Sequence, residues 1–253
     1  MQTYNKYLSA VILTACTCAS SLVNANGVEQ PAPEWTEYWE PEPRVVTPGP
    51  VPSDAIVLLG KDTGLSQWQH KEGEAAKWTF DNGVMTVKAG TSGVNSKQKF
   101  CDMQLHIEWR TPPKGKEDWQ VGQNSGNSGI YIQGRYEVQV LDSYQNRTYS
   151  NGQAGSVYKQ TPPLVNASKP NMQWQTYDII YRAPRFDSEG RIDQKAYVTV
   201  LHNGVLVQNH TQIQGPTVFR GYPRYTEAHG CESIHLQDHG NPVSYRNIWV
   251  RPL

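Results

Sequence analysis

The sequence has no excess of charge of either sign, because 23 Lys and Arg residues balance 23 Asp and Glu residues over 253 positions. Proteins that hold nucleic acid or an anionic membrane surface by charge carry a basic patch or a basic net charge. The balanced composition argues against such a charge-driven surface, and we expect no nucleic-acid partner.

Motifs for cofactors are also missing. No glycine-rich phosphate loop follows a strand-like segment, and no Gly-x-Ser-x-Gly elbow is present. The four cysteines form no Cys-x-x-Cys pair, which argues against a zinc site. We therefore expect neither a cofactor nor a bound metal.

Long hydrophobic runs are absent as well. The apolar run Leu8–Ala15 is too short to span a bilayer and is typical of an export signal, predicted over residues 1–25. Two cleavage patterns remain open: the segment LTAC has the form of a bacterial lipobox and would put a lipid anchor on Cys16, whereas VNA, ending at Ala25, suits ordinary signal peptidase. Either pattern predicts an exported bacterial protein, periplasmic or held at the outer membrane as a lipoprotein.

Prolines gather just after this signal. Seven of the 17 prolines lie within residues 26–53, which predicts an extended, Pro-rich tether. Two cysteines remain beyond the tether, Cys101 and Cys231. An oxidising compartment permits a disulfide between them, but the sequence cannot show that they meet, so a disulfide and two free thiols both stay open.

Residues 54–253 show the two-residue alternation of β-strands. In the segment 103–110 the apolar side chains occupy every second position, and Asn82-Gly83 and Asn203-Gly204 have the composition of two-residue hairpin turns. No stretch of ten residues has a clear helical period. The pattern predicts one all-β domain, a β-sandwich of antiparallel sheets.

The segment GNSGIYIQGRYEVQVLDSY, residues 126–144, has an unusual polar face. Alternation predicts that Tyr136, Val138 and Val140 share one side of a strand and that Arg135, Glu137 and Gln139 share the other. Arginine, carboxylate and amide side chains match sugar hydroxyls. The strand therefore indicates a carbohydrate-binding surface.

Asp142 lies five positions after Glu137 and would point to the opposite face of a regular strand. A β-bulge between Gln139 and Asp142 would return both carboxyl groups to one face. They would then be about 5 to 9 Å apart, the range used to cleave glycosidic bonds. The alternative is that Asp142 ends the strand and caps the following turn.

Four segments together resemble the 3-keto-disaccharide hydrolase family: GNSGIYIQGRYEVQVLDSY, FCDMQLHIEWRTP, WQTYDIIYRAPRFD and IHLQDHGNPVSYRNIWVRPL. The resemblance covers about residues 53–253 and implies a concanavalin A-like jelly-roll sandwich that forms the catalytic domain. The strand with Glu137, Gln139 and Asp142 is also similar to the Glu-x-Asp-x-x-Glu catalytic strand of laminarinase-type glycosidases. It departs from that pattern at two of three positions, which counts against a double displacement with Glu137 as nucleophile.

The family resemblance implies a different reaction. Its substrates are glycosides whose C3 a separate oxidoreductase has converted to a ketone. The ketone acidifies the hydrogen at C2, so a base can remove that hydrogen and expel the C1 substituent by β-elimination. Addition of water then completes a net hydrolysis, with donors on the enolate oxygen and an acid for the leaving group.

Eight residues are candidates for this site. The proton-transfer candidates are Glu137, Asp142 and His239, of which the histidine has the alternative of a loop residue bonded to local backbone. The candidates for substrate binding are Arg135, Gln139, Tyr158, Lys159 and Gln237. Lys159 has the alternative of a solvated charge.

Three functions follow from these patterns. The first is an exported enzyme that cleaves 3-keto-glycosides or 3-keto-disaccharides. The second is a non-catalytic carbohydrate-binding module, because one sandwich fold serves many functions. The third is a retaining glycosidase of the laminarinase type. The cluster of ionisable residues favours the first, because pure sugar binding is usually managed with amides and aromatic rings.

Overall fold

The computed structural model describes residues 31–114 and 121–253. The predicted export signal and Cys16 lie outside the described residues. Two compact units divide the chain, Met1–Val45 and Val46–Leu253. In the described part of the first unit, the regular structure is one turn of 3₁₀ helix, η1 (Pro33–Thr36). Within the described ranges no helix has the length and apolarity needed to cross a membrane.

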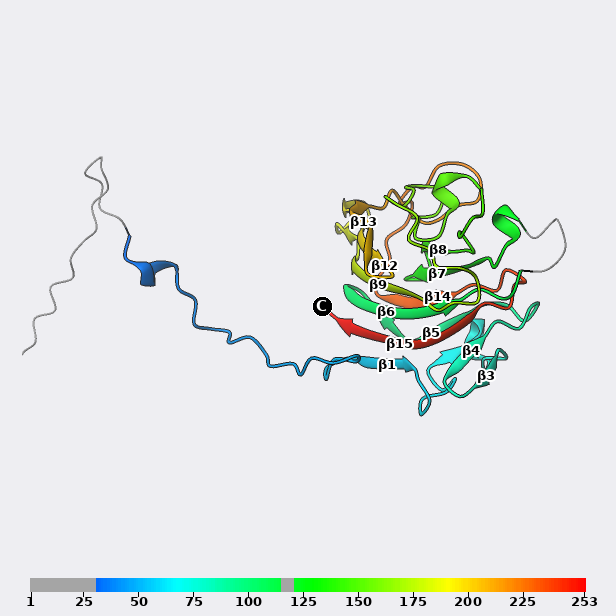
Figure 1. The fold of residues 1–253 in the computed structure, drawn as a ribbon. Coiled ribbons are helices and arrows are strands. Elements are labelled where there is room, and N and C mark those ends of the chain that lie inside the picture. The colour runs from blue at the N-terminus through cyan, green and yellow to red at the C-terminus, as the bar shows by residue number, and fades with distance from the viewer. Residues whose placement is uncertain (1–30, 115–120) are drawn as a thin grey trace, which may run out of the picture. The chain divides into compact units, whose positions relative to one another are not determined.

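The second unit is a sandwich of two antiparallel sheets (Figure 1). The larger sheet runs in the order β13 (Val205–Gln212), β12 (Tyr197–His202), β9 (Gln175–Arg182), β6 (Met103–Arg110), β15 (Ser244–Pro252), β4 (Val84–Thr86) and β3 (Thr79–Asp81), with β1 (Ile56–Leu59) also paired to β15. The smaller sheet runs in the order β2 (Trp68–Gln69), β5 (Val94–Phe100), β14 (Glu232–Leu236), β7 (Ser128–Ile132) and β8 (Tyr136–Val140).

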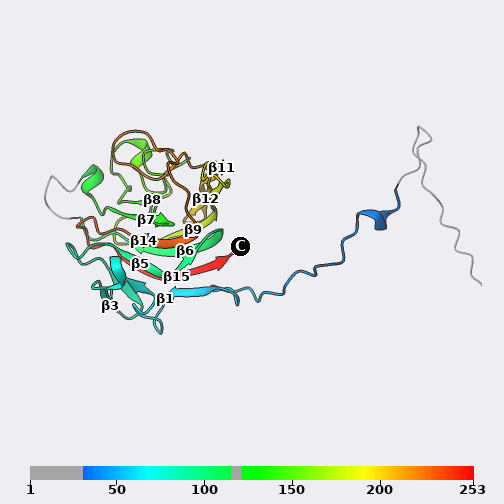
Figure 2. The same ribbon diagram turned by 180° about the vertical axis from the view of Figure 1, so that it is seen from behind.

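The remaining elements are short. A two-stranded ribbon joins β10 (Arg185–Phe186) to β11 (Ile192–Gln194), and three 3₁₀ turns lie in loops: η2 (Lys71–Gly73), η3 (Gly122–Asn124) and η4 (Ser150–Gly152). The chain passes repeatedly between the two sheets, for example from β5 to β6, from β8 to β9 and from β14 to β15 (Figure 2). This confirms the all-β jelly-roll sandwich of two antiparallel sheets.

The core lies between the sheets and follows from the alternation of side chains. On β6, Met103, Leu105, Ile107 and Trp109 are all at most 1% exposed, while the residues between them are half-buried. Such a face must pack against another layer, because each apolar side chain removed from water contributes roughly 1.5–3 kcal/mol. The smaller sheet supplies that layer, with the same alternation along β7 and β8.

Both predicted hairpins are present. Asn82 and Gly83 have φ values of 45° and 84° between β3 and β4, and Asn203 and Gly204 have φ values of 53° and 79° between β12 and β13. A tight turn that matches the twist of its strands needs two left-handed residues, and Asn-Gly adopts them at little cost.

Cys101 and Cys231 form a disulfide. Cys101 follows β5 and Cys231 precedes β14. These two strands pair with each other, and in their register Glu232 lies opposite Phe100. Of the two alternatives left open by the sequence, the structure selects the disulfide. The bridge closes a separation of 130 residues, and by loop entropy such a link stabilises a fold by roughly 3 to 5 kcal/mol.

Candidate active site

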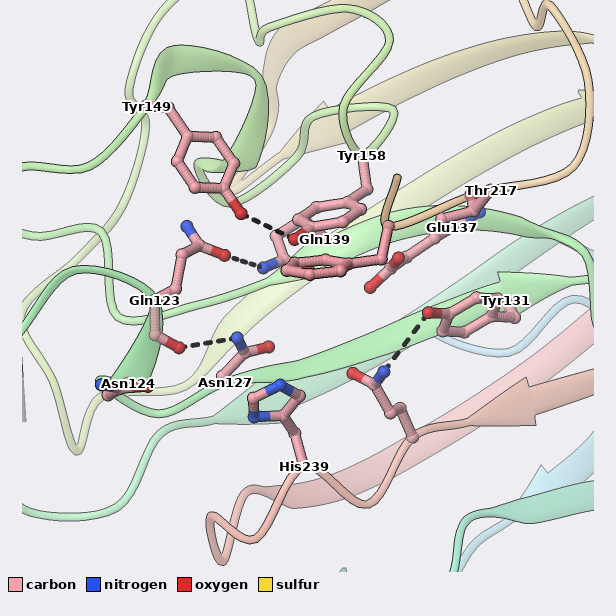
Figure 3. A pocket seen from close by; sticks show the side chains of 12 residues that line it. Gln123, Asn124, Asn127, Tyr131, Glu137, Gln139, Tyr149, Tyr158, Thr217 and His239 are labelled. Carbon is pink, nitrogen blue, oxygen red and sulfur yellow. Dashed lines mark hydrogen bonds between the residues drawn. The ribbon is translucent and has the colours of Figure 1, made fainter. Parts of the chain in front are cut away.

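A cavity of about 590 Å³ opens on the side of β7 and β8 that faces away from the core (Figure 3). Its lining residues are Gln123, Asn124, Asn127, Tyr131, Glu137, Gln139, Tyr149, Tyr158, Thr217, Phe219, Gln237 and His239. On β7 and β8 these residues alternate with core residues, so one strand face builds the sandwich and the other builds the cavity. The lining is rich in amides and tyrosines, which suits an uncharged, hydroxyl-bearing ligand.

Two loops cover the free edge of β8 and form the far wall. The loop from β8 to β9 runs beside the strand, where the N–H of Tyr158 donates to the Glu137 carbonyl (3.1 Å) and the N–H of Gly155 donates to the Gln139 carbonyl (3.0 Å). The loop from β13 to β14 adds Thr217, whose hydroxyl accepts from the Glu137 N–H at 3.0 Å. These bonds satisfy an edge that would otherwise be open, and they bury Glu137.

Glu137 is 3% exposed and lies against the wall of the cavity. Its carboxyl oxygen Oε1 occupies the space beside Gly129 on β7, where any Cβ would overlap it. Burial raises the pKa of Glu137 to about 8, and a hydrogen bond from Tyr131 opposes that rise only in part. A carboxyl with this pKa exchanges a proton near neutral pH, as general acid–base catalysis requires.

Tyr131 lies directly opposite Glu137 in the pairing of β7 with β8. Burial, and then the charge of Glu137, raises the pKa of Tyr131 far above its usual value, so the hydroxyl keeps its proton. The Gln237 side chain donates to this hydroxyl at 3.3 Å, and the Gln237 Oε1 atom is buried without a partner among the described residues. His235 packs edge-on against the Tyr131 ring at 5.5 Å, and burial lowers the pKa of that imidazole to about 4.

Gln139 is 1% exposed and lies between two neighbours. In the orientation of Figure 3 its amide nitrogen donates to Gln123 Oε1 at 3.1 Å. With the amide turned by 180°, the nitrogen instead donates to Glu137 Oε1 at 3.0 Å and to the Ser128 carbonyl at 3.1 Å. The amide is therefore within hydrogen-bonding distance of the carboxyl group in either orientation.

His239 is exposed and points into the cavity from the loop between β14 and β15 (Figure 3). Its neighbour Asp238 holds this loop, accepting from the N–H groups of Thr91 (3.0 Å) and Gly240 (2.9 Å). Asn241 donates to the His239 carbonyl at 3.3 Å and accepts from the Gly126 N–H at 3.1 Å. The backbone of His239 is thus held in place, and its imidazole is exposed to solvent at the cavity surface.

Tyr158 lines the cavity as the sequence suggested, and its hydroxyl pairs with that of Tyr149 at 2.6 Å. Lys159 is not a lining residue. Its ammonium donates to the Phe219 carbonyl at 2.6 Å and lies 4.1 Å from the centroid of the Phe219 ring. This placement corrects the expectation of Lys159 as a sugar ligand, because the ammonium fastens the loop of the far wall instead.

The prediction that a bulge brings Asp142 onto the face of Glu137 is wrong. Strand β8 ends at Val140 with its register to β7 unbroken, and Asp142 lies in the loop beyond it. Its carboxylate accepts from Ser125 Oγ and from the Tyr144 N–H, each at 3.3 Å, and pairs with Lys114 at 3.4 Å. Asp142 caps the turn, and it is not among the lining residues.

Arg135 also lies elsewhere than expected. It belongs to the turn between β7 and β8 rather than to the strand, and its guanidinium pairs with Glu227 at 2.7 Å. The left-handed residues Gln133 (φ 52°) and Gly134 (φ 61°) make that turn. Gln-Gly marks the turn in the sequence, but a two-residue turn there would have placed Tyr131 opposite Tyr136. The turn includes Arg135 as a third residue, which sets Tyr131 opposite Glu137, so the sequence signalled the turn and not this register.

The other missed lining residues, Gln123, Asn124, Asn127, Tyr149, Thr217 and Phe219, come from loops. Loop positions show no periodicity, so no pattern could assign them to the cavity. His106 and Glu108 lie on β6 outside the cavity, where they pair with Asp178 (2.7 Å) and Arg246 (2.6 Å). In the part of the chain that the structure describes, no three His, Cys, Asp or Glu side chains gather into a potential metal site.

The chemistry of the cavity follows from its lining. Among the described residues that line it, Glu137 is the one carboxyl and His239 the one imidazole, and the lining includes no Lys or Arg. A displacement that uses two carboxylates on the sugar finds only one of them here. The arrangement can move a proton at Glu137, donate from tyrosine and amide groups, and move a second proton at His239.

Known proteins support an assignment to glycoside-cleaving enzymes. The sequence model of the 3-keto-alpha-glucoside-1,2-lyase-like domain matches residues 54–251. A 3-keto-disaccharide hydrolase of Bacteroides thetaiotaomicron is 23% identical over 236 residues, covering 81% of this chain and 80% of that protein. A crystal structure from Parabacteroides distasonis, described as a candidate glycosyl hydrolase, has a TM-score of 0.82 and 46% identity, covering 92% of this chain and 100% of that one. Another from the same organism shares the fold, with a TM-score of 0.54 and 18% identity over 79% of this chain and 99% of that one.

Proposed function

The chain belongs to the family of 3-keto-alpha-glucoside-1,2-lyase-like domains, and on that premise we propose that it cleaves the glycosidic bond of 3-keto-glycosides by β-elimination. The observation that carries the proposal is a single buried carboxyl, Glu137, whose pKa is raised to about 8 and which faces hydrogen-bond donors in a polar cavity. Proton abstraction next to a ketone needs one base of this kind and no carboxylate nucleophile.

The reaction balances in two stages. Ionised Glu137 takes the proton from C2, and the electron pair of that C–H bond forms the enolate of the C3 ketone. Collapse of the enolate makes the C1–C2 double bond and breaks the bond from C1 to the leaving oxygen, which takes a proton from His239. Water then adds at C1 and a proton returns to C2, which gives the free 3-keto sugar.

The other lining residues have supporting roles in this proposal. Tyr131 and Tyr158 keep their protons because burial raises the pKa of both hydroxyls. The O–H of Tyr158 can therefore donate to the developing enolate oxygen, and the O–H of Tyr131, which donates to ionised Glu137, becomes free to do so once Glu137 takes the proton from C2. Such a contribution is largest in a water-poor site. Gln237 has a buried Oε1 that no described residue partners, and this oxygen can accept from a sugar hydroxyl.

Cleavage of matched glucosides, one native and one 3-keto of each anomer, tests the proposal with the purified full chain. We expect release of the aglycone from the keto member alone, and in D₂O enzyme-dependent deuterium at C2 of the product. Glu137→Gln should lower the rate at least about 100-fold, the lower end of what a positioned base contributes. His239→Ala should lower the cleavage rate less for a leaving group that needs no proton than for one that must be protonated. His210→Ala, which changes an exposed histidine outside the cavity, is the matched control.

Other outcomes would favour the competing functions. Cleavage of the native glucoside would support a retaining glycosidase, although Asp142 does not line the cavity as that mechanism needs. Binding of both sugars without cleavage of either would support a carbohydrate-binding module, which the amide-rich lining would also serve.

The proposal extends to a partner enzyme and to the location of the protein. A C3 ketone must be supplied by a separate oxidoreductase acting on the intact glycoside, and we include that enzyme in the proposal. We further propose that the protein is exported from a bacterium and carries a lipid on Cys16. Labelling cells with a palmitate analogue tests the anchor: incorporation lost in Cys16→Ser supports it, and cleavage after Ala25 without label overturns it.

A further inference from the structure

The amide of Gln139 meets acceptor groups at both of its ends. One end faces Gln123 Oε1 at 3.1 Å. The other end faces Glu137 Oε1 at 3.0 Å and the Ser128 carbonyl at 3.1 Å. An amide carries its hydrogens on nitrogen alone, so only one end of Gln139 can be served at a time.

The orientation of Gln123 is set by its other contacts. Its Nε2 atom donates to the Gly152 carbonyl at 2.9 Å and to Thr148 Oγ1 at 3.1 Å. A backbone carbonyl can only accept, so turning Gln123 would bring two oxygens together at Gly152. Gln123 therefore presents an acceptor to Gln139 in every state.

At the opposite end of the Gln139 amide, the charge of Glu137 decides whether the carboxyl group accepts or donates a hydrogen bond. An ionised carboxylate accepts, and together with the Ser128 carbonyl it presents two acceptors to Gln139. A protonated carboxyl has an O–H of its own, which can donate to the amide oxygen of Gln139. Protonation of Glu137 therefore replaces one of the two acceptors at this end by a donor and leaves the Ser128 carbonyl as the other. The balance between the two ends of the amide shifts toward Gln123 when Glu137 gains its proton.

We propose that Gln139 is a positioning residue whose amide turns with the charge of Glu137: its nitrogen faces the ionised carboxylate, and it faces Gln123 when the carboxyl is protonated. The contribution to catalysis rests on the proposed function, whereas the coupling itself does not. Both side chains are almost fully buried, at 1% and 3% exposure, so the hydrogen bond between them is weakly screened.

The coupling extends to the sugar. When the nitrogen of Gln139 faces Glu137, the oxygens of Gln139 and Gln123 face each other at 3.1 Å. Two acceptors at that distance call for a donor, and a substrate hydroxyl supplies one. Binding of that hydroxyl therefore favours the ionised form of Glu137, and by linkage ionisation favours binding. The substrate would prepare its own base.

Other titratable groups also surround Glu137. Tyr131 on β7 donates to it, Tyr158 in the following loop and Tyr245 on β15 lie within its electrostatic range, and His239 shares the cavity. These groups are the same whichever variant of Gln139 or Gln123 is present. We call the coupling between the Gln139 amide and the charge of Glu137 the amide relay. The relay differs from these other effects because it predicts pKa shifts of opposite sign for substitutions at Gln139 and at Gln123.

The test is a carboxyl titration by ¹³C NMR of the full chain labelled at Glu Cδ, with the Glu137 signal assigned by its loss in Glu137→Gln. Gln139→Leu removes the donor to the carboxylate and should raise the midpoint of Glu137 by roughly one pH unit. Gln123→Leu removes the competing acceptor and should lower it. Gln212→Leu, a glutamine outside the cavity, should leave it unchanged. Methionine at each position provides a second pair of variants should leucine impair folding.

A non-reactive native glucoside serves as the probe of the sugar coupling. It should lower the midpoint of Glu137 in the unmodified chain and not in Gln123→Leu. Shifts of the same sign in the Gln139 and Gln123 variants, or no shift in either, would overturn the relay. Absence of keto-glycoside cleavage with opposite shifts intact would instead refute the proposed function and leave the relay standing.

Discussion

The raised pKa of the buried Glu137 carboxyl predicts how stability depends on pH, and this prediction can be tested without a substrate. The pKa of Glu137 is about 8 in the folded protein and has an ordinary value of 4.5. The folded state therefore holds this proton more tightly than the unfolded chain. By linkage, the free energy of unfolding falls as the pH rises from about 4.5 to about 8 and levels off above that range.

The size of the effect follows from the two pKa values. At 1.36 kcal/mol for each pKa unit, the difference between 8 and 4.5 makes ionised Glu137 cost on the order of 5 kcal/mol of stability. Glu137→Gln keeps the shape of the protonated side chain and removes the charge. We expect the variant and the unmodified protein to have similar stability at pH 5, and the variant to be several kcal/mol more stable at pH 9.

Urea unfolding followed by Trp fluorescence at pH 5, 7 and 9 measures this difference, with Glu72→Gln as the control for an exposed glutamate. The control should follow the unmodified protein at every pH. The reasoning would be refuted by stability curves of Glu137→Gln and the unmodified protein that run parallel from pH 5 to pH 9. A site that lowers the stability of its own fold in this way is typical of function, because stability alone selects a neutral side chain.

Three further substitutions test the geometry of the cavity. Gly129→Ala overlaps the Glu137 carboxyl and should lower kcat/KM roughly 100-fold and stability by about 1–3 kcal/mol. Gly230→Ala, with nothing near its Cβ, is the control and should change neither quantity. Activity and thermal-unfolding assays measure both. Asp142→Asn should leave kcat/KM within about threefold while costing about 1 kcal/mol, and a loss as large as that of Glu137→Gln would return Asp142 to the chemistry. Lys159→Met should raise KM more than it lowers kcat, because its ammonium holds a wall loop; a selective fall in kcat would contradict that role.

Much of the fold was predictable because its signals are local. Alternation along residues 103–110 requires one buried face, and Asn203-Gly204 requires a tight hairpin, whatever the rest of the chain does. Glu137 and Gln139 were identified in the same way, as polar residues on a strand whose other face is apolar. His239 and Gln237 came from the family resemblance, and both line the cavity.

The errors concern residues whose orientation depends on distant contacts. Asp142 turns away from Glu137 because Ser125 and Lys114 offer it partners beyond the end of β8. Lys159 turns from the cavity because a loop 60 residues later presents a carbonyl to it. Periodicity reports the direction of a side chain only while the strand lasts, and both residues lie past its end.

The amino-acid sequence alone determined the two-layered β architecture, the face on which Glu137 lies and the family of the chain. Only the tertiary structure decided that Cys101 pairs with Cys231, that loops wall the cavity, and that Glu137 holds its proton near neutral pH. Strand periodicity is a property of neighbouring residues and is written into their order. Burial is a property of everything packed around a group, so the pKa of one carboxyl depends on segments from residue 123 to residue 239 that come together only in the folded chain.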